Sequence, residues 1–134
     1  MKNVWGWSCL FSLVLAGCGG DSHQVSWEGT VTIEGKPLPE NLRVAVIQVR
    51  PMREIPGVAP VQAEIVDSQF FLSGIPKGKV WVTLIIEQKT GKIIREKYAP
   101  EYEEVVNIVP PSKRNGFAME VMGNERKMVL DLKK

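Results

Sequence analysis

The stretch that decides the fold runs from residue 67 to residue 88 and reads DSQFFLSGIPKGKVWVTLIIEQ. Apolar residues alternate with other residues in both halves, which is typical of strands that bury one face. Pro76 and Gly78 supply turn chemistry between the halves. The predicted inward side chains are Phe70, Leu72 and Ile75 in the first half and Val82, Leu84 and Ile86 in the second. The stretch therefore predicts two strands whose inward rows face each other in two packed sheets.

The sequence on either side of this stretch also favours strands. From residue 25 onward there are 25 Val and Ile residues against 11 Ala and Leu residues, a bias away from the best helix formers. Residues 25–33 alternate cleanly and place Trp27, Val31 and Ile33 on one buried face. Residues 43–49 predict another strand, residues 62–66 and 69–72 a hairpin around Asp67-Ser68, and residues 117–122 and 127–132 a closing hairpin around residues 123–125. The fold class is therefore mainly β.

Two segments have no clear strand pattern. Residues 51–60 contain three prolines and one glycine, and we predict a long exposed loop there. Residues 79–88 form the longest predicted strand, and Lys89-Thr90-Gly91 follows it. Residues 92–109 hold paired apolar residues amid charges, and they are compatible with a short helix, a strand pair or a long excursion. Pro110-Pro111 ends that segment.

The first residues predict an export signal and not a part of the fold. Met1-Lys2-Asn3 is a short cationic start, and residues 4–16 form an apolar run that is too short for a membrane span of about 20 residues. The run closes as Leu15-Ala16-Gly17-Cys18, which resembles a bacterial lipobox, the motif in which the cysteine is lipidated and becomes the new first residue. We expect residues 1–17 to be cleaved as a lipoprotein signal peptide.

Lipidation of Cys18 predicts a protein anchored in the cell envelope. Cys9 leaves with the signal, so the mature chain has neither a disulfide nor a free thiol. Several acyl chains give stable membrane anchoring. Gly19 follows the cysteine in place of the Asp that resemblance links to inner-membrane retention, which favours the outer membrane. Residues 18–25 form a flexible tether of at most about 20 Å beyond the lipidated cysteine, and residues 26–134 form the folded domain.

Composition excludes several function classes. A formal net charge of +2 is too small to indicate nucleic-acid binding. One histidine and two cysteines provide no zinc framework, and His23 lies in the tether, where nothing holds it beside a nucleophile. Glu101, Glu103 and Glu104 form the tightest acidic cluster, but no calcium-loop motif surrounds them. The sequence predicts no enzyme activity, no cofactor and no specific metal site.

Three stretches resemble a known family. One is the tail, which runs from Val109-Pro110-Pro111 through Phe117 to Gly123-Asn124 and Leu130-Asp131-Leu132 and resembles the end of its members. Residues 27–39, WEGTVTIEGKPLP, and residues 67–80, DSQFFLSGIPKGKV, are similar to motifs of small bacterial lipoproteins with a transthyretin-like, carboxypeptidase regulatory-like domain. Ser68 and Val80 depart from the Gly and Tyr that are usual in that family. The resemblance implies a prealbumin-like, Ig-like antiparallel β-sandwich of about seven strands. It also implies a non-catalytic folding, docking or carbohydrate-contacting module.

Trp81 is the main candidate for a binding surface. If Val82, Leu84 and Ile86 face the core, Trp81 faces the other side of the sheet. There it either anchors a partner or stacks on a sugar ring, or residues 92–109 cover it. Tyr98 and Tyr102 are the candidates for the cover or for an aromatic strip. We therefore predict a module that docks an envelope protein or supports an envelope assembly, with a carbohydrate-binding module as the alternative.

Overall fold

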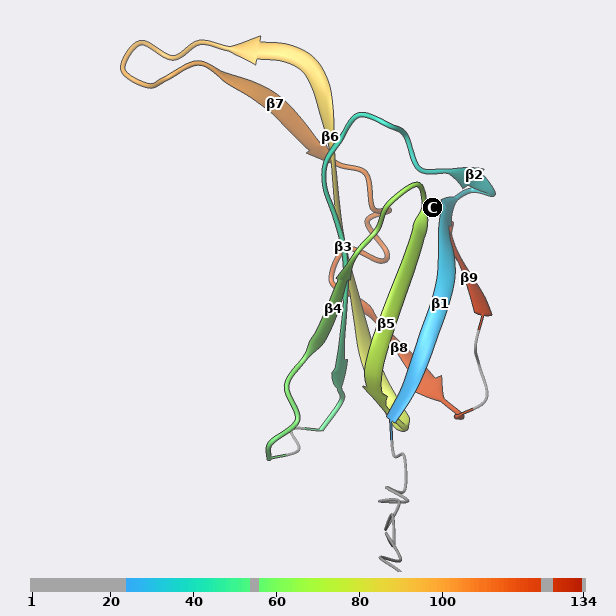
Figure 1. The fold of residues 1–134 in the computed structure, drawn as a ribbon. Helices are drawn as coiled ribbons and strands as arrows, with labels where there is room; N and C mark the ends of the chain where they lie inside the picture. The colour runs from blue at the N-terminus through green and yellow to red at the C-terminus, as the bar shows by residue number, and fades with distance from the viewer. Residues whose placement is uncertain (1–23, 54–55, 124–126, 134) are drawn as a thin grey trace, which may run out of the picture.

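The computed structural model describes residues 24–53, 56–123 and 127–133, and these contain nine β-strands and no helix (Figure 1). The predicted signal peptide at residues 1–17, the predicted lipidation site Cys18 and His23 lie outside the described residues. The strands are β1 (Gln24–Ile33), β2 (Lys36–Pro37), β3 (Leu42–Pro51), β4 (Val61–Glu64), β5 (Gln69–Pro76), β6 (Gly78–Ile94), β7 (Tyr102–Asn107), β8 (Phe117–Val121) and β9 (Lys127–Leu132). The predicted mainly β fold class is confirmed.

The strands form two sheets that pack as a β-sandwich. In the first sheet, β1 pairs with β5 and the short β2 on one edge and with β9 on the other. In the second sheet, β3 lies between β4 and β6, and the far edge of β6 pairs with β7 and β8. The pairing of β1 with β9 is parallel, so the first sheet is mixed and not purely antiparallel as expected. Every pairing in the second sheet is antiparallel.

The predicted closing hairpin at the C-terminal end is wrong. β8 pairs with β6 in the second sheet, whereas β9 pairs with β1 in the first sheet. The chain thus crosses the sandwich between residues 121 and 127. Val121 on β8 and Leu130 on β9 both enter the shared core. Alternation showed that each segment buries one face, but it carried no information on which strand each would join.

The predicted hairpin around Asp67-Ser68 is a corner between the sheets. Asp67 and Ser68 have φ values of 49° and 65°, and Val66 and Gln69 form the single bridge at the turn. Beyond this turn the two strands of the predicted hairpin separate, because β4 pairs with β3 and β5 pairs with β1. The buried Ser68 hydroxyl accepts a hydrogen bond from the Leu38 amide at 2.8 Å. Ser68 therefore ties this corner to the segment after β2.

The core contains every inward side chain predicted for residues 67–88. Trp27 is fully buried, and its Nε1 has no hydrogen-bond partner among the described residues. Along β6, buried residues alternate with more exposed ones from Val80 to Ile86. The buried side chains shared by the two sheets include Val31, Ile47, Val49, Phe70, Leu72, Ile75, Val80, Val82, Leu84, Ile86 and Leu132. These rows confirm the predicted two-sheet packing.

A two-stranded arm leaves the sandwich at its upper end (Figure 1). β6 does not end at Gln88 but continues to Ile94 and pairs with β7, so residues 92–109 contain a strand and not a helix. The register shifts between Lys89 and Ile93, where Gly91 has a φ of 80°. Extra residues in one strand bend it, which explains why β6 turns away from the body here. We call residues 89–107 the arm and the remaining sandwich the body.

Candidate functional site

Trp81 lies on the outer face of the second sheet, as the alternation predicted. It is half-buried between its register partners Arg50 on β3 and Ala118 on β8. Its Nε1 donates a hydrogen bond to the Asn115 carbonyl at 3.1 Å. Gly116 has a φ of 92°, and a Cβ on it would lie 2.4 Å from that same Nε1. The absence of a side chain at Gly116 is what lets this segment close over the indole.

The expectation that residues 92–109 cover Trp81 is wrong. The covering segment is residues 113–116, just before β8. Residues 92–109 are carried off by the far end of β6, where β7 pairs with residues 87–94. Because Trp81 is partly covered and its N–H is hydrogen-bonded, the indole does not present an open face on which a sugar ring could stack.

The exposed part of Trp81 borders a hollow of about 770 Å³. Its other walls come from the end of β3 and from the predicted loop at residues 51–60. Arg50 is the one charged residue among the residues that line it. The lining residues are Arg50, Pro51, Met52, Pro56, Val58, Pro60 and Trp81. We call this hollow the Trp81 slot, and its chemistry is apolar with a single guanidinium at the rim.

Tyr98 and Tyr102 lie on the arm and do not meet Trp81. Tyr98 is 91% exposed, and Tyr102 is register partner to Ile94 at the opposite end of β6 from Trp81. The Tyr102 hydroxyl donates to Glu96 Oε1 at 3.1 Å, and this hydrogen bond, reinforced by the carboxylate charge, raises the pKa of Tyr102. The aromatic strip considered from the sequence is therefore absent among these three residues.

The arm is held by local polar contacts. Arg95 Nε lies 2.8 Å from Glu101 Oε1 in an exposed ion pair, and Thr90 Oγ1 donates to Glu104 across the two strands. Exposed ion pairs contribute little to stability. At the same time the arm presents four large apolar or aromatic side chains to solvent, namely Ile93, Tyr98, Tyr102 and Val106. This is the exposed cluster farthest from the body.

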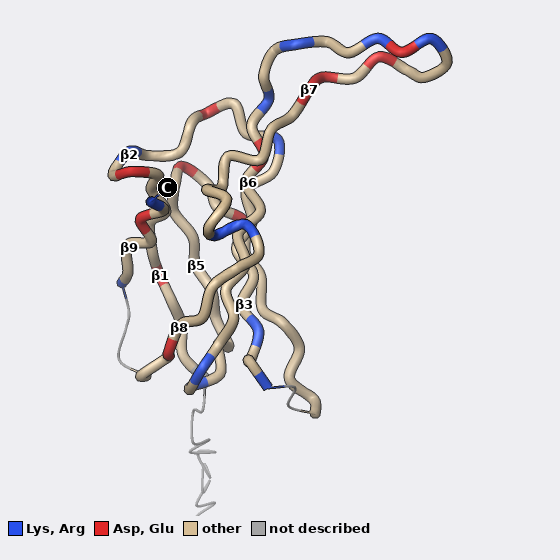
Figure 2. Tube along the Cα trace, turned by 180° about the vertical axis from the view of Figure 1, so that it is seen from behind, with Lys and Arg blue, Asp and Glu red and all other residues tan. Residues whose placement is uncertain are grey.

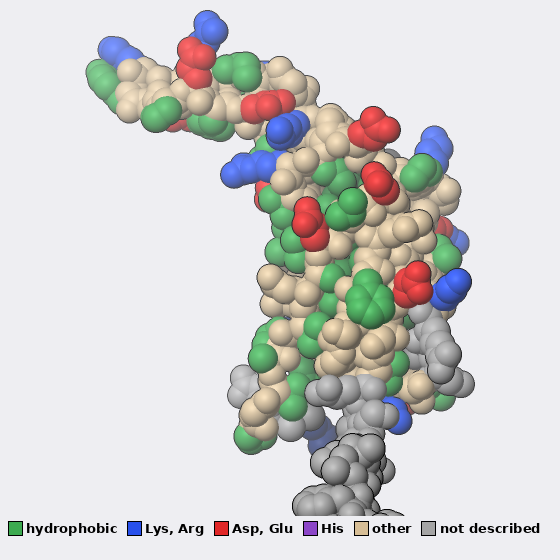
Figure 3. Space-filling view, viewed as in Figure 1, with side chains coloured by type: hydrophobic (Ala, Val, Ile, Leu, Met, Phe, Trp, Pro, Cys, Tyr) green, Lys and Arg blue, Asp and Glu red, His purple; other side chains and the backbone are tan. Residues whose placement is uncertain are grey.

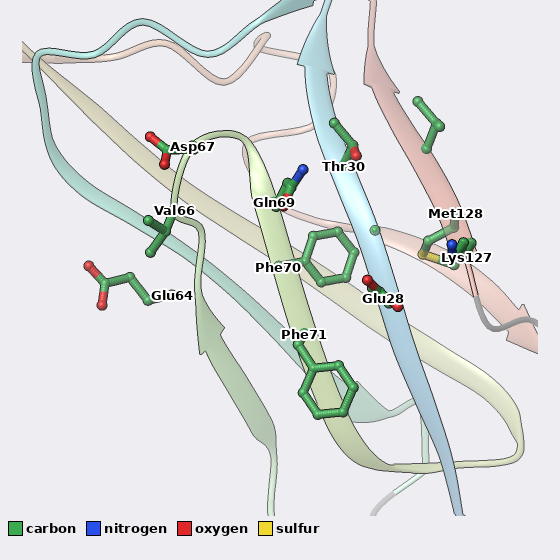
Figure 4. Close-up of a pocket in the computed structure, with 12 residues that line it drawn as sticks. Glu28, Thr30, Glu64, Val66, Asp67, Gln69, Phe70, Phe71, Lys127 and Met128 are labelled. Atoms are coloured by element: carbon green, nitrogen blue, oxygen red, sulfur yellow. The ribbon is translucent and has the colours of Figure 1, made fainter.

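A second hollow, of about 700 Å³, lies on the outer face of the first sheet (Figure 4). Phe70 points toward β1 over Gly29, where a Cβ would lie 2.6 Å from the ring, while Phe71 projects outward and is 61% exposed. Val66 and Val129 are further exposed apolar residues in its lining. The sequence reasoning missed this surface, although consecutive Phe residues on one strand require that one of them faces out.

The part of the chain that the structure describes contains no cluster of side chains suited to hold a metal ion. Within residues 24–53, 56–123 and 127–133, no three His, Cys, Asp or Glu side chains gather where they would hold a metal ion. The acidic cluster of the arm instead makes local contacts through Glu101 and Glu104. Among these residues there is also no helix long and apolar enough to cross a membrane.

The comparisons with known proteins give no relative for this chain: no family model, no curated protein and no solved structure matches it. The fold alone therefore defines the class of this protein. It is a mainly β sandwich with two hollows on its outer faces and a projecting two-stranded arm.

Proposed function

We propose that this protein is a lipid-anchored, non-catalytic module of the bacterial cell envelope that docks an envelope protein through its arm. One observation carries the proposal. The arm lies at the opposite end of the body from Gln24, where the described chain enters β1 (Figure 1). A domain tethered at the Gln24 end would hold the arm away from the membrane.

The anchor in this proposal is the lipidated Cys18. It follows Leu15-Ala16-Gly17 at the end of an apolar run, and only residues 19–23 separate it from β1. Those residues span at most about 20 Å, so the body sits next to its membrane. Gly19 after the cysteine supports the outer membrane as the location.

The arm has the properties of a docking element. A two-stranded ribbon without a third strand is at best marginally stable in water. Among the described residues no third strand pairs with β7 or with β6 beyond Gln88, and such an open strand edge pairs readily with an added strand of a partner. Ile93 and Val106 are 51% and 41% exposed, and a partner would bury them. The pairing of β6 with β7 aligns the ribbon before binding, which lowers the entropic cost of association.

We further propose that the sandwich is of the transthyretin-like, carboxypeptidase regulatory-like type. The second family-like stretch coincides with the corner at Asp67-Ser68, with β5 and with the start of β6. Gly74 and Gly78 in that stretch have φ values of 76° and 106°, which glycine adopts without strain. Such domains are chiefly non-catalytic folding, docking or carbohydrate-contacting modules, which is compatible with the proposed role and with a carbohydrate-binding one.

A carbohydrate-binding role is the alternative, and the exposure of Tyr98 favours it. A stacking site normally uses aromatic faces that lie together, but Trp81 lies at the other end of β6 from both tyrosines. A sugar would therefore contact the arm tyrosines without the tryptophan.

The anchor is tested by fractionation. Globomycin, which blocks lipoprotein signal cleavage, should make the uncleaved precursor accumulate, and the mature protein should carry acyl chains on Cys18. Cys18→Ala should remove the acylated form. Recovery of an unacylated wild-type protein in the soluble fraction would contradict the anchor.

The docking role is tested by photo-crosslinking in intact cells. A photoreactive residue replaces Ile93, Tyr98 or Val106 on the arm, and Arg43, an exposed residue on the body, serves as the matched control. We expect a discrete protein adduct from the arm positions and none from position 43. Adducts that consist of polysaccharide would support the alternative, and equal adducts at all four positions would contradict an arm-specific partner.

A further inference from the structure

Four cationic side chains surround the end of the body at which the chain enters. Gln24 at the start of β1 pairs with Pro76, and Lys77 follows directly. Lys79 lies beside Met52, whose amide donates to the Lys79 carbonyl at 3.1 Å. Arg50 and Arg53 flank Met52 in the sequence, and all four cations are exposed. We call Arg50, Arg53, Lys77 and Lys79 the basic end.

These charges are not neutralised within the described residues. Glu120, the register partner of Lys79, is the acid nearest to them in the strand pairing. No ion pair in residues 24–53, 56–123 or 127–133 involves any of the four cations, and the one ion pair found there is Arg95–Glu101 on the arm. In Figure 2, blue segments lie at this lower end of the tube, while the arm carries both signs of charge. The basic end is therefore an attractive surface for anions.

Apolar groups accompany these cations. Met52 is 49% exposed, and the Trp81 slot opens beside Arg50. Long cationic side chains together with methionine and tryptophan suit the boundary between lipid headgroups and water. A soluble acidic partner would use the charges but would have no comparable need for the apolar groups beside them.

We propose that the basic end rests on the anionic phospholipid headgroups of the membrane that holds the anchor, and that this contact sets the orientation of the domain. The inference rests on the proposed lipidation of Cys18. The tether of at most about 20 Å keeps this end close to the surface, where the potential of anionic lipids decays over roughly 8 Å at physiological salt. The arm then points into the aqueous space.

The size of the effect follows from the charges. Each Lys or Arg near an anionic membrane surface favours the bound state by about fivefold. Reversing two of the four cations should therefore shift the balance between docked and undocked domain by at least about 25-fold. High salt should weaken the contact in the same direction, because ions screen the surface.

The test uses the lipidated full-length protein as processed by the cell, reconstituted into vesicles. One set contains phosphatidylcholine alone, and the other contains phosphatidylcholine with phosphatidylglycerol. An amine-reactive reagent labels the lysines, and mass spectrometry reports the rate at each site. We expect Lys77 and Lys79 to react several-fold more slowly on the anionic vesicles, and the difference to vanish at high salt. Lys92 and Lys97 on the arm are the internal controls and should react equally on both.

Charge reversal identifies the groups responsible. Arg50→Glu with Arg53→Glu leaves both reporter lysines in place and should abolish their protection. Arg43→Glu with Arg95→Glu makes the same change in net charge away from the basic end and should leave the protection intact. Equal labelling of Lys77 and Lys79 on both kinds of vesicle, or protection that survives Arg50→Glu with Arg53→Glu, would overturn the lipid contact.

The anchor fails in a different way. A Cys18 peptide without acyl chains, in a protein that does not associate with either vesicle, would refute the proposed lipidation. An acylated Cys18 with unprotected Lys77 and Lys79 would refute only the lipid contact.

Discussion

The body and the arm are built from the same kind of strand, and β6 runs through both, but their environments differ. In the body, residues from both sheets form one buried cluster. In the arm, none of residues 89–107 is buried. The space-filling view shows the arm as a narrow extension with hydrophobic, basic and acidic side chains on its surface (Figure 3). β6 thus continues beyond the buried core as a strand that only its backbone pairing with β7 extends.

The difference shows where stability and recognition reside. Burial of apolar surface is the main stabilising contribution to folding, and the body contains nearly all of it. The arm contributes hydrogen bonds and exposed ion pairs, whose net effect on stability is small. Changes in the body should therefore unfold the protein, whereas changes in the arm should alter what it binds.

The largest effect is expected from Trp27 at the centre of the body. Trp27→Ala leaves a cavity and should cost about 3–5 kcal/mol of unfolding free energy. Trp27→Phe keeps most of the ring and removes an N–H that has no partner among the described residues, so it should cost less than about 1.5 kcal/mol. Equilibrium urea unfolding measures both. Trp81 is half-buried, so Trp81→Ala should lower the free energy of unfolding clearly less than Trp27→Ala does. An equal loss would show that the outer face of the second sheet is buried as a second core.

Two isoleucines on β6 compare the regions directly. Ile86 is fully buried in the body, and Ile93 is 51% exposed on the arm. Ile86→Ala should cost about 2–5 kcal/mol, whereas Ile93→Ala should stay within about 0.5 kcal/mol of wild type. The same urea titration decides between them. A large loss for Ile93→Ala would show that the arm contributes to folding and is not a separable docking element.

Ser68 probes the corner that holds the two sheets together. Ser68→Ala leaves the Leu38 amide without its acceptor in a buried position and should cost about 1–3 kcal/mol. Ser68→Gly loses the same hydrogen bond but relieves the positive φ of 65°, so it should cost less than the alanine variant. If both variants unfold at the wild-type urea midpoint, the hydrogen bond does not stabilise the corner.

The smallest effect is expected from Asp131 on β9, and it depends on pH. Its Oδ1 accepts hydrogen bonds from the Gly35 amide at 2.8 Å and from the Thr32 hydroxyl at 2.9 Å, and these lower its pKa below 3.8. Because the pKa of Asp131 is lower in the folded state than in the unfolded state, the ionised carboxylate stabilises the fold fully above the unfolded-state pKa. This stabilisation is lost as the pH falls through the folded-state pKa. Urea midpoints measured from pH 6 down to about pH 2 should fall less in Asp131→Asn than in wild type. If the urea midpoints of Asp131→Asn and wild type fall in parallel with pH, the Asp131 carboxylate does not contribute to stability in this way.

Local patterns predicted what depends on burial. The alternation in residues 25–33 and 67–88 identified Trp27 and the inward rows of β5 and β6, because side chains of a strand face opposite sides of its sheet. The turn at Asp67-Ser68 was also found, although its role as a corner was not. The outward direction of Trp81 followed from the same periodicity, but its cover at residues 113–116 did not.

What the sequence by itself determined is which segments are strands and which of their faces are apolar. Only the tertiary structure decided that β9 joins β1 in parallel, that β8 joins β6 instead of β9, and that β6 carries the arm away from Trp81. The physical reason is that alternation reports the burial of a face, which is a local property. The choice of partner strand depends on the packing of segments far apart in the chain, where several pairings bury the same faces equally well.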